Sequence, residues 1–185
     1  NLILIGGNRE SKDTGERELM AFFEEFMASH PHLLGRFAHV EALPNEDIRR
    51  VEHKLMEREA DAYPNLYVCS SVKEEFGISI LEAMSEGFLA FAPIRGGVKT
   101  YLVNGVNGFL VDTASDSTLK HDMEHVLYHA QLHPADYKKI QRAGKRTVLD
   151  QFSIEEIAKH FLELYLGLSG GGELLCVANG SFSSW

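Results

Sequence analysis

Residues 69–84 read CSSVKEEFGISILEAM, and this stretch decides how the chain is expected to fold. An apolar run of strand length, 66–70, leads into it, a short polar loop follows, and apolar spacing then indicates a helix at 81–86. A strand, a tight loop and a helix in that order are typical of parallel α/β sheets. Ligands of such sheets bind at the carboxyl ends of the strands, where helix N-termini present free N–H groups. This stretch therefore predicts an anion-binding edge.

The same alternation continues outward along the chain. Short apolar runs predict strands at 2–6, 37–41, 66–70, 88–92 and 108–111. Helical periodicity predicts helices at 16–29, 47–60, 81–86, 98–103, 119–132, 134–149 and 154–168. Pro134 fits the first turn of its helix, and Ser153 with Glu156 forms an N-terminal capping box for the last one. We therefore expect an α/β fold with a parallel sheet covered by helices on both faces.

The composition narrows the class of protein. The chain has 185 residues and a formal net charge of −9, without a block rich in lysine and arginine, which argues against nucleic acid or an anionic membrane surface as a partner. Cys69 and Cys176 are too few and too far apart for a disulfide framework or a thiolate metal site, so a cytoplasmic setting is expected. No apolar run reaches the roughly 20 residues that span a bilayer, so no transmembrane segment is predicted.

Both ends of the chain suggest a part of a longer protein. The first residues, Leu2 to Ile5, already have the pattern of a core strand, and neither an initiating methionine nor a signal peptide precedes them. After residue 168, the run SGGG at 169–172 predicts a flexible break, and a strand is expected at 174–178. We therefore expect one domain at 1–168, truncated at its N-terminus, and a Gly-rich linker and tail at 169–185 that begins a further segment.

Glu74 and Glu82 are the candidate binding carboxylates of the central stretch. On one continuous helix they would lie about 12 Å apart along the axis and could not hold one atom. With Glu74 in the loop and Glu82 on the helix, they could hold hydroxyl-bearing groups on either side of a diphosphate, as in a nucleotide-sugar. Gly77 would let the backbone approach this ligand, with the amides of Ile78 and Ser79 as donors. The alternative is that both carboxylates are solvated surface charges.

Four segments together resemble a known family. They are residues 70–77, residues 81–84, the pair Gly96-Gly97, and residues 104–111, which read NGVNGFLV. In this order they resemble the donor-binding half of the retaining group 1 glycosyltransferases, and a weaker similarity extends from residue 1 to about residue 168. The resemblance implies a Rossmann-like lobe of a GT-B type glycosyltransferase, in which two such lobes hold a nucleotide-sugar in the cleft between them.

The resemblance also implies a role for each residue of the central motif. Glu74 matches the first glutamate of the family's Glu-x7-Glu motif, the catalytic position that contacts the transferred sugar near the reacting centre. Glu82 matches the second glutamate, which holds the ribose hydroxyls. The family's turn whose backbone amides meet sugar and phosphate is matched by Phe76, Gly77, Ile78 and Ser79. No Asp-x-Asp pair stands in a suitable loop, so we expect no metal or other cofactor, and the helix dipole and cations would stabilise the leaving diphosphate.

The loop after the first strand is a second candidate for donor binding. Residues 6–13 read GGNRESKD and would supply backbone donors from Gly6 and Gly7 and a cation from Arg9. This loop is similar to the equivalent loop in the sucrose synthase and sucrose-phosphate synthase branch of the family. The alternative is a tight turn between strand and helix with solvated charges.

Departures from the family pattern limit what this chain is expected to do alone. The family's paired arginine and lysine, which neutralise the donor diphosphate, would lie before Asn1, and so would the acceptor lobe. Thr100 stands where the family usually has an acidic residue, and Pro93 replaces a usual threonine or serine. The chain is therefore expected to bind donor weakly and to turn nothing over by itself.

Two other patterns are interpreted as structural. On one predicted helix a histidine recurs every four residues, at positions 121, 125, 129 and 133. Each step climbs about 6 Å and drifts about 40°, so the four cannot converge on one ion, and a polar helix face is favoured. Residues 96–100, GGVKT, are similar to the end of a phosphate-binding P-loop but lack its adjacent Gly-Lys pair. They are interpreted as a Gly-Gly turn near the donor cleft.

The leading hypothesis is a donor-binding lobe of a retaining enzyme that moves a hexose from a nucleotide-sugar to an acceptor hydroxyl. The acceptor would be a sugar or sugar phosphate bound with the missing N-terminal lobe. In the family's front-side mechanism the leaving phosphate helps to deprotonate the acceptor, and Glu74 orients the sugar rather than attacking it. Two alternatives stay open, namely a non-catalytic nucleotide-binding or regulatory module with the same fold, and a GT-B type phosphorylase.

Overall fold

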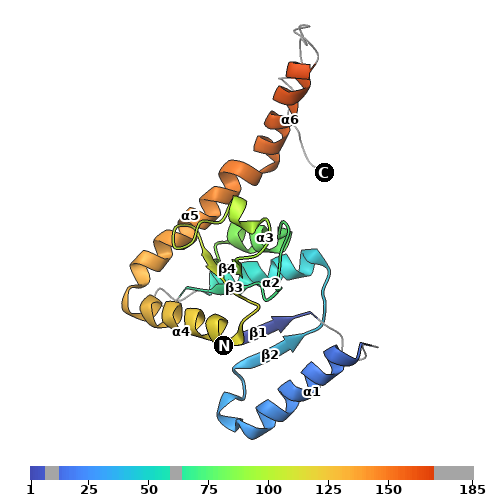
Figure 1. Cartoon of the computed structure of the whole chain (residues 1–185), viewed down its shortest axis with the longest axis vertical. Coiled ribbons are helices and arrows are strands. Elements are labelled where there is room, and N and C mark those ends of the chain that lie inside the picture. Colours follow the sequence, from blue (N-terminus) through green and yellow to red (C-terminus); the bar gives the residue numbers. More distant parts are fainter. Residues whose placement is uncertain (7–12, 59–63, 169–185) are drawn as a thin grey trace. The chain divides into compact units, whose positions relative to one another are not determined.

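The computed structural model describes residues 1–6, 13–58 and 64–168. The chain divides into two compact units, Asn1–Leu55 and Met56–Trp185, and the boundary falls within helix α2 (Asn45–Glu57). Each unit has its own parallel sheet, and the two strands of the first sheet are drawn as neighbouring blue arrows in Figure 1.

The first unit is built on one pair of parallel strands. Its elements before α2 are β1 (Leu2–Ile5), α1 (Thr14–Ser29), the 3-10 helix η1 (Pro31–Leu33) and β2 (Phe37–Val40). The two strands pair in parallel, with Leu2 opposite Phe37. Phe23 of α1 stacks on Phe37 with the ring centroids 5.4 Å apart, so the helix packs against this strand. Both predicted strands are confirmed to within one residue.

The second unit carries a three-stranded parallel sheet in the order β3-β4-β5. Its strands are β3 (Leu66–Val68), β4 (Leu89–Pro93) and β5 (Phe109–Val111). Its helices are α3 (Ile78–Glu86), the 3-10 helix η2 (Val98–Thr100), α4 (Asp116–Leu132), α5 (Pro134–Phe152) and α6 (Ile154–Leu168). The three strands lie within two residues of the predicted bounds.

The central strand β4 is buried along its whole length, and its side chains alternate between two apolar cores. Ala90 and Ala92 belong to a core with residues of α3, η2 and α5. Leu89 and Phe91 belong to a second core, which includes Val126 of α4. Alternation along one strand places helices on both faces of the sheet. The predicted α/β architecture is therefore confirmed.

The ends of the helices follow the sequence signals closely. Pro134 is the first residue of α5, and the Ser153 hydroxyl oxygen accepts a hydrogen bond from the Glu156 amide at 3.3 Å, which is one half of the predicted capping box. α3 begins at Ile78 rather than at residue 81. The reason is Gly77, which caps the helix in the left-handed conformation with φ of 76°.

The helix predicted at 98–103 is only the short turn η2, because Asn107 binds the backbone that would extend it. The amide of Val103 donates to Oδ1 of Asn107 at 2.7 Å, and Nδ2 of Asn107 donates to the Tyr101 carbonyl at 2.8 Å and to Oγ1 of Thr147 at 2.9 Å. Asn107 is buried, so these bonds are made away from solvent. They turn the chain towards β5.

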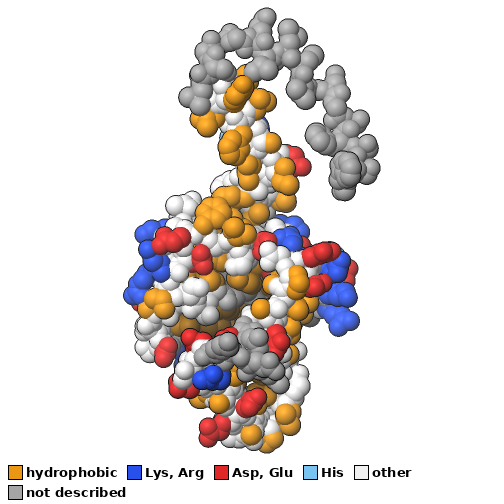
Figure 2. Space-filling view, turned by 90° about the vertical axis from the view of Figure 1, so that its right-hand side faces the viewer, with side chains coloured by type: hydrophobic (Ala, Val, Ile, Leu, Met, Phe, Trp, Pro, Cys, Tyr) orange, Lys and Arg blue, Asp and Glu red, His pale blue; other side chains and the backbone are white. Residues whose placement is uncertain are grey.

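α6 follows α5 and leaves most of its apolar side chains exposed, as Figure 2 shows. These side chains are Ile154, Ile157, Phe161, Leu162, Leu164, Tyr165 and Leu166. Among the described helices none is long and apolar enough to cross a membrane. The predicted break at 169–172 and the predicted strand at 174–178 lie outside the described residues.

Candidate functional site

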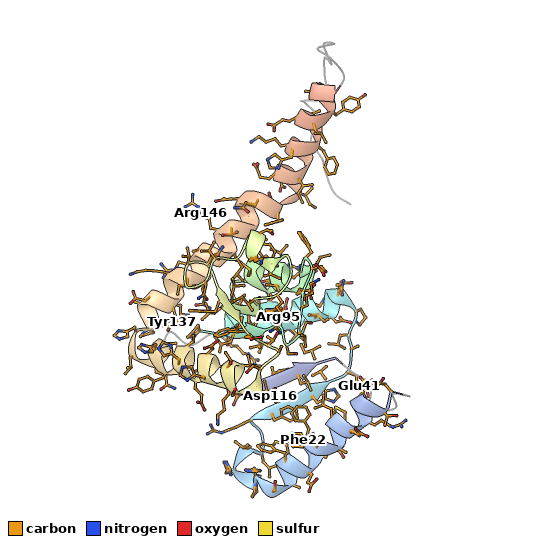
Figure 3. All side chains as sticks on the ribbon, viewed as in Figure 1. Phe22, Glu41, Arg95, Asp116, Tyr137 and Arg146 are labelled. Carbon is orange, nitrogen blue, oxygen red and sulfur yellow. The ribbon has the colours of Figure 1, made fainter. Side chains whose placement is uncertain are left out.

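The loop after β3 and the loop after β4 are joined through the backbone of Glu74. The amide of Glu74 donates to the carbonyl of Arg95 at 3.1 Å, and the carbonyl of Glu74 accepts from the amide of Gly97 at 3.0 Å. Glu74 and Gly96 thereby form an isolated parallel bridge beyond the ends of the two strands. The place of Arg95 after β4 can be followed in Figure 3. The backbone of Glu74 is therefore fixed from both sides at the carboxyl edge of the sheet.

Gly96 and Gly97 must be glycines because the Glu74 loop lies directly against them. A Cβ atom added to Gly96 would lie 2.0 Å from the Glu74 carbonyl oxygen, and one on Gly97 would lie 2.1 Å from the Glu75 carbonyl oxygen. Gly96 also has φ of 110°, a conformation that L side chains rarely adopt. The predicted Gly-Gly turn therefore serves to bring two loops into backbone contact.

Gly77 forms the turn that opens α3. Its carbonyl accepts from the amides of Ile80 at 3.0 Å and Leu81 at 3.1 Å. The amides of Ile78 and Ser79 precede these bonds, so they are donors without an intrahelical acceptor. Gly77 is buried, whereas Phe76 and Ile78 are 48% and 65% exposed. Exposed apolar side chains beside such amides give a surface suited to an anionic ligand with less polar parts.

The two predicted carboxylates occupy the loop and the helix, as the sequence suggests. Glu74 is half-buried, and a Cβ atom on Gly77 would lie 3.1 Å from its Cγ, so the stem of its side chain lies over the start of α3. Its carboxylate makes no hydrogen bond or ion pair with any part of the chain that the structure describes. Glu82 is half-buried on α3, one turn after Ile78 and on the same helix face.

The predicted loop after the first strand is described only at its start. The amide of Gly6 donates to the Val40 carbonyl at 3.0 Å, and the Gly6 carbonyl accepts from Nε2 of His39 at 2.8 Å. Gly6 has φ of 130° and belongs to the first unit. Gly7 and Arg9, the other two candidates of this loop, lie outside the described residues.

Tyr101 contacts the candidate site and was not predicted from the sequence. Its hydroxyl donates to the Phe76 carbonyl at 2.7 Å, and its ring meets the ring of Phe76 edge-on with centroids 6.1 Å apart. Phe152 at the end of α5 packs edge-on against both rings, at 5.5 Å from Tyr101 and 6.0 Å from Phe76. Burial, and secondly the charge of Glu74, raise the pKa of Tyr101 well above its ordinary value. The hydroxyl therefore stays protonated, and a donor, even at a pH where an ordinary tyrosine begins to ionise.

The one available sequence signal for Tyr101 was its polar hydroxyl within an apolar segment, since a buried tyrosine hydroxyl needs an acceptor. That signal does not identify the acceptor. Phe76 is 25 residues earlier in the chain, and only the folded sheet brings it to the hydroxyl.

We expect Tyr101→Phe to lower the free energy of unfolding by about 1–2 kcal/mol, because it removes the donor to the Phe76 carbonyl at 2.7 Å and to the Gly77 carbonyl at 3.4 Å while keeping the ring. The midpoint of urea denaturation, followed by circular dichroism, measures this change. Tyr128→Phe is the matched control, because Tyr128 is 61% exposed and its change should stay within about 0.5 kcal/mol. Equal midpoints for the two variants would contradict a stabilising role for the Tyr101 hydroxyl.

The positions that depart from the family pattern have structural partners. The Thr100 hydroxyl donates to the Gly97 carbonyl at 2.7 Å and closes the Gly-Gly turn. Pro93 is fully buried at the end of β4.

Two cations of the site loops are paired, Lys73 with Glu75 and Arg95 with Asp112 at 3.3 Å. Their charge is therefore partly neutralised by neighbouring carboxylates.

The four regularly spaced histidines run along α4 and its C-terminal end. Neighbouring ring centroids are 6.5 Å apart for His121 and His125, 4.3 Å for His125 and His129, and 6.3 Å for His129 and His133. In the residues that the structure describes, no group of three or more His, Cys, Asp or Glu side chains is placed to hold a metal ion.

The chain has recognisable relatives in sequence. A family model described as glycosyl transferases group 1 matches residues 53–147, which is just over half of the chain. A sucrose synthase of Acidithiobacillus caldus is 28% identical over 167 residues, and one of Solanum tuberosum is 26% identical over 166. Each match covers 89% of this chain but 20% of the relative. The chain thus spans about a fifth of the length of these curated relatives.

Solved structures with the same fold include two at 20–22% identity. A sucrose-phosphate synthase from Thermosynechococcus elongatus has a TM-score of 0.66 and 22% identity, over 90% of this chain and 38% of that protein. Anabaena HepE, in complex with UDP-glucose, has a TM-score of 0.64 and 20% identity, over 89% of this chain and 40% of that protein. At this level of identity the similarity supports the fold.

Proposed function

Because the chain belongs to the group 1 glycosyl transferases, we propose that it is the donor-binding lobe of a retaining glycosyltransferase. The reaction would move a hexose from a nucleoside-diphosphate sugar to an acceptor hydroxyl. One observation carries the proposal: the backbone of Glu74 is fixed by Arg95 and Gly97 while its carboxylate has no partner in the described part of the chain. A carboxylate held in place but not used by the fold suits ligand binding.

The start of α3 provides the second part of the proposed site. The amides of Ile78 and Ser79 point out of a helix N-terminus, where the dipole favours a phosphate group. Glu82, one turn further on, would accept hydrogen bonds from the ribose hydroxyls. Glu74 would accept hydrogen bonds from the transferred sugar. In this arrangement the diphosphate lies between the two carboxylates, and no metal is required by the proposal.

The proposed chemistry is a front-side displacement. The bond between the anomeric carbon and the donor phosphate breaks, a bond from that carbon to the acceptor oxygen forms on the same face, and the acceptor proton passes to the leaving phosphate. Electrons and protons balance without a nucleophile from this chain. The residues of the lobe would contribute position and charge stabilisation, which can account for several kcal/mol of the barrier.

UDP-glucose is the donor to test first, because HepE is known in complex with it and sucrose synthases are among the sequence relatives. Calorimetric titration of the chain should show weak, saturable binding of UDP-glucose. Glu74→Ala should lower the affinity for UDP-glucose and leave the affinity for UDP unchanged, because this residue would contact only the sugar. Glu82→Ala should lower the affinity for both ligands, because the ribose that Glu82 would bind is present in both.

Glu75→Ala is the matched control for this titration. Glu75 is exposed and paired with Lys73, so its loss should change neither affinity. Unchanged UDP-glucose affinity in Glu74→Ala would overturn the assignment of the sugar contact. If the chain binds UDP and UDP-glucose equally well, with or without Glu74, a regulatory nucleotide-binding module would be favoured. Phosphate-dependent release of a sugar phosphate by the longer protein would favour a phosphorylase.

A further inference from the structure

A cavity lies in the second unit, at the C-terminal end of α3. It has a volume of about 230 Å³ and is bordered by Glu86 and Gly87 and by four residues of α5, namely Lys138, Gln141, Arg142 and Lys145. The start and the end of α3 are about 12 Å apart along the helix axis. Gly87 stands just before β4, so this cavity lies at the amino edge of the sheet, opposite the Glu74 loop.

The inner wall of the cavity is fixed by buried contacts. Gln141 is only 4% exposed, and its Nε2 donates to the Gly87 carbonyl at 3.0 Å. One turn further along α5, a Cβ atom on Gly144 would lie 2.7 Å from the Asn107 carbonyl oxygen, so the helix is packed closely against the chain before β5. The cations on this face of α5 are therefore carried by a firmly placed helix.

Four of the five cations of α5 fall into two groups, and the fifth, Lys138, has an interaction of its own within the chain. Lys139 is paired with Asp136 at 3.0 Å, and Arg146 with Asp150 at 3.2 Å. Arg142 and Lys145 make no ion pair within residues 1–6, 13–58 and 64–168. Arg142 and Lys145, which both border the cavity, are thus not neutralised by an ion pair in the described part of the chain.

Two cations at the cavity carry the charge argument. Lys138 and Glu86 also border the cavity, but both have interactions of their own within the chain, so neither is counted here. Arg142 and Lys145 contribute two positive charges side by side, on a chain whose formal net charge is −9. Two neighbouring cations are suited to an anion such as a phosphate group.

We propose that this cavity is a binding site for a small phosphate-bearing ligand, separate from the donor site. Arg142 and Lys145 are three residues apart on α5, so their side chains leave the helix as neighbours and can contact one phosphate group together. The volume lies below the range of about 300–1,000 Å³ that is usual for drug-sized ligands, so it suits a phosphate with few further atoms. Met56 lines the cavity and would contact the carbon part of a phosphate ester.

The test is an NMR titration of the full chain with inorganic phosphate, at constant ionic strength maintained with chloride. The Gly87 amide and the amides of 138–145 should shift with one saturable curve. Combined Arg142→Gln and Lys145→Gln should weaken this binding at least about tenfold, because two charge-assisted contacts are lost. Combined Lys139→Gln and Arg146→Gln removes the same charge from the same helix and should leave the affinity within about twofold. Figure 3 shows Arg146 pointing away from the body of the unit.

A parallel titration with glycerol 3-phosphate distinguishes the source of the phosphate group. Tighter binding than inorganic phosphate would indicate a phosphorylated metabolite, and equal binding would indicate phosphate itself; both support the site. Two results would overturn the proposed site. One is chemical shift changes that grow linearly with phosphate concentration, and the other is an equal loss of phosphate affinity in both double variants. Arg142 and Lys145 would then only interact with the C-terminal end of α3 or add to the overall charge. Glu74→Ala should retain the Gly87 shift, so this outcome is independent of the proposed donor site.

Discussion

Glu74→Ala is expected to lower sugar transfer by roughly 100- to 1,000-fold in an enzyme that contains this lobe, with the fold intact. The reason is that the backbone and the side chain of Glu74 have different roles. Its amide and carbonyl hold the loop through Arg95 and Gly97, and alanine keeps both groups. Its carboxylate has no partner in the described part of the chain, so removing it costs little folding free energy. The loss would therefore fall on the reaction rather than on stability.

Steady-state kinetics and thermal melting of the same variant separate these two effects. Glu75→Ala is the control, because it removes a neighbouring carboxylate that is exposed and paired with Lys73. It should retain nearly normal turnover. Near-normal turnover in Glu74→Ala, with an unchanged melting temperature, would exclude Glu74 from the reaction centre.

Gly96→Ala is expected to destabilise the chain by about 3–5 kcal/mol, the largest stability effect that we predict. Two costs add at this position. The new Cβ atom would stand 2.0 Å from the Glu74 carbonyl oxygen, which is backbone and cannot rotate away, and φ of 110° is strained for any L side chain. The loops after β3 and β4 would have to separate. Urea denaturation followed by circular dichroism measures the change.

Two further glycine variants separate the clash from the backbone strain. Gly105 has φ of 73° but nothing within 4 Å of an added Cβ, so Gly105→Ala should cost only about 1–2 kcal/mol. Gly97 has φ of −88° but a clash at 2.1 Å, so Gly97→Ala tests the contact without the strain. If Gly96→Ala lowered the free energy of unfolding no more than Gly105→Ala, the two loops could not lie as close together as described.

Much of the fold could be predicted because its signals are local. The apolar runs around residues 66–70 and 88–92, the proline at 134 and the serine at 153 each act within a few residues of their own position. The sequence pattern therefore predicted five strands and the ends of the long helices closely. It did not show how the described strands would pair, and they form two sheets, one in each unit. Pairing depends on contacts between distant segments, which periodicity does not report.

The candidate site was predictable as a motif but not as a geometry. The order of Glu74, Gly77 and Glu82 along the chain indicated a strand, a loop and a helix, and the structure has all three. The bridge from Glu74 to Gly96 and the hydroxyl contact from Tyr101 to Phe76 join residues more than twenty positions apart. Their partners become neighbours only when β4 lies beside β3. The roles proposed for the two carboxylates stay predictions until the titrations and kinetics are done.

The two hydrogen bonds that hold the backbone of Glu74 also affect the entropy of ligand binding. A loop that orders only when its ligand arrives loses conformational freedom at that moment, at about 1–2 kcal/mol for each residue, and the affinity falls accordingly. Here the bonds to Arg95 and Gly97 belong to the folded chain, so Glu74 loses this freedom when the sheet forms. A ligand that meets Glu74 would find its position already set, and weak contacts could then give measurable affinity.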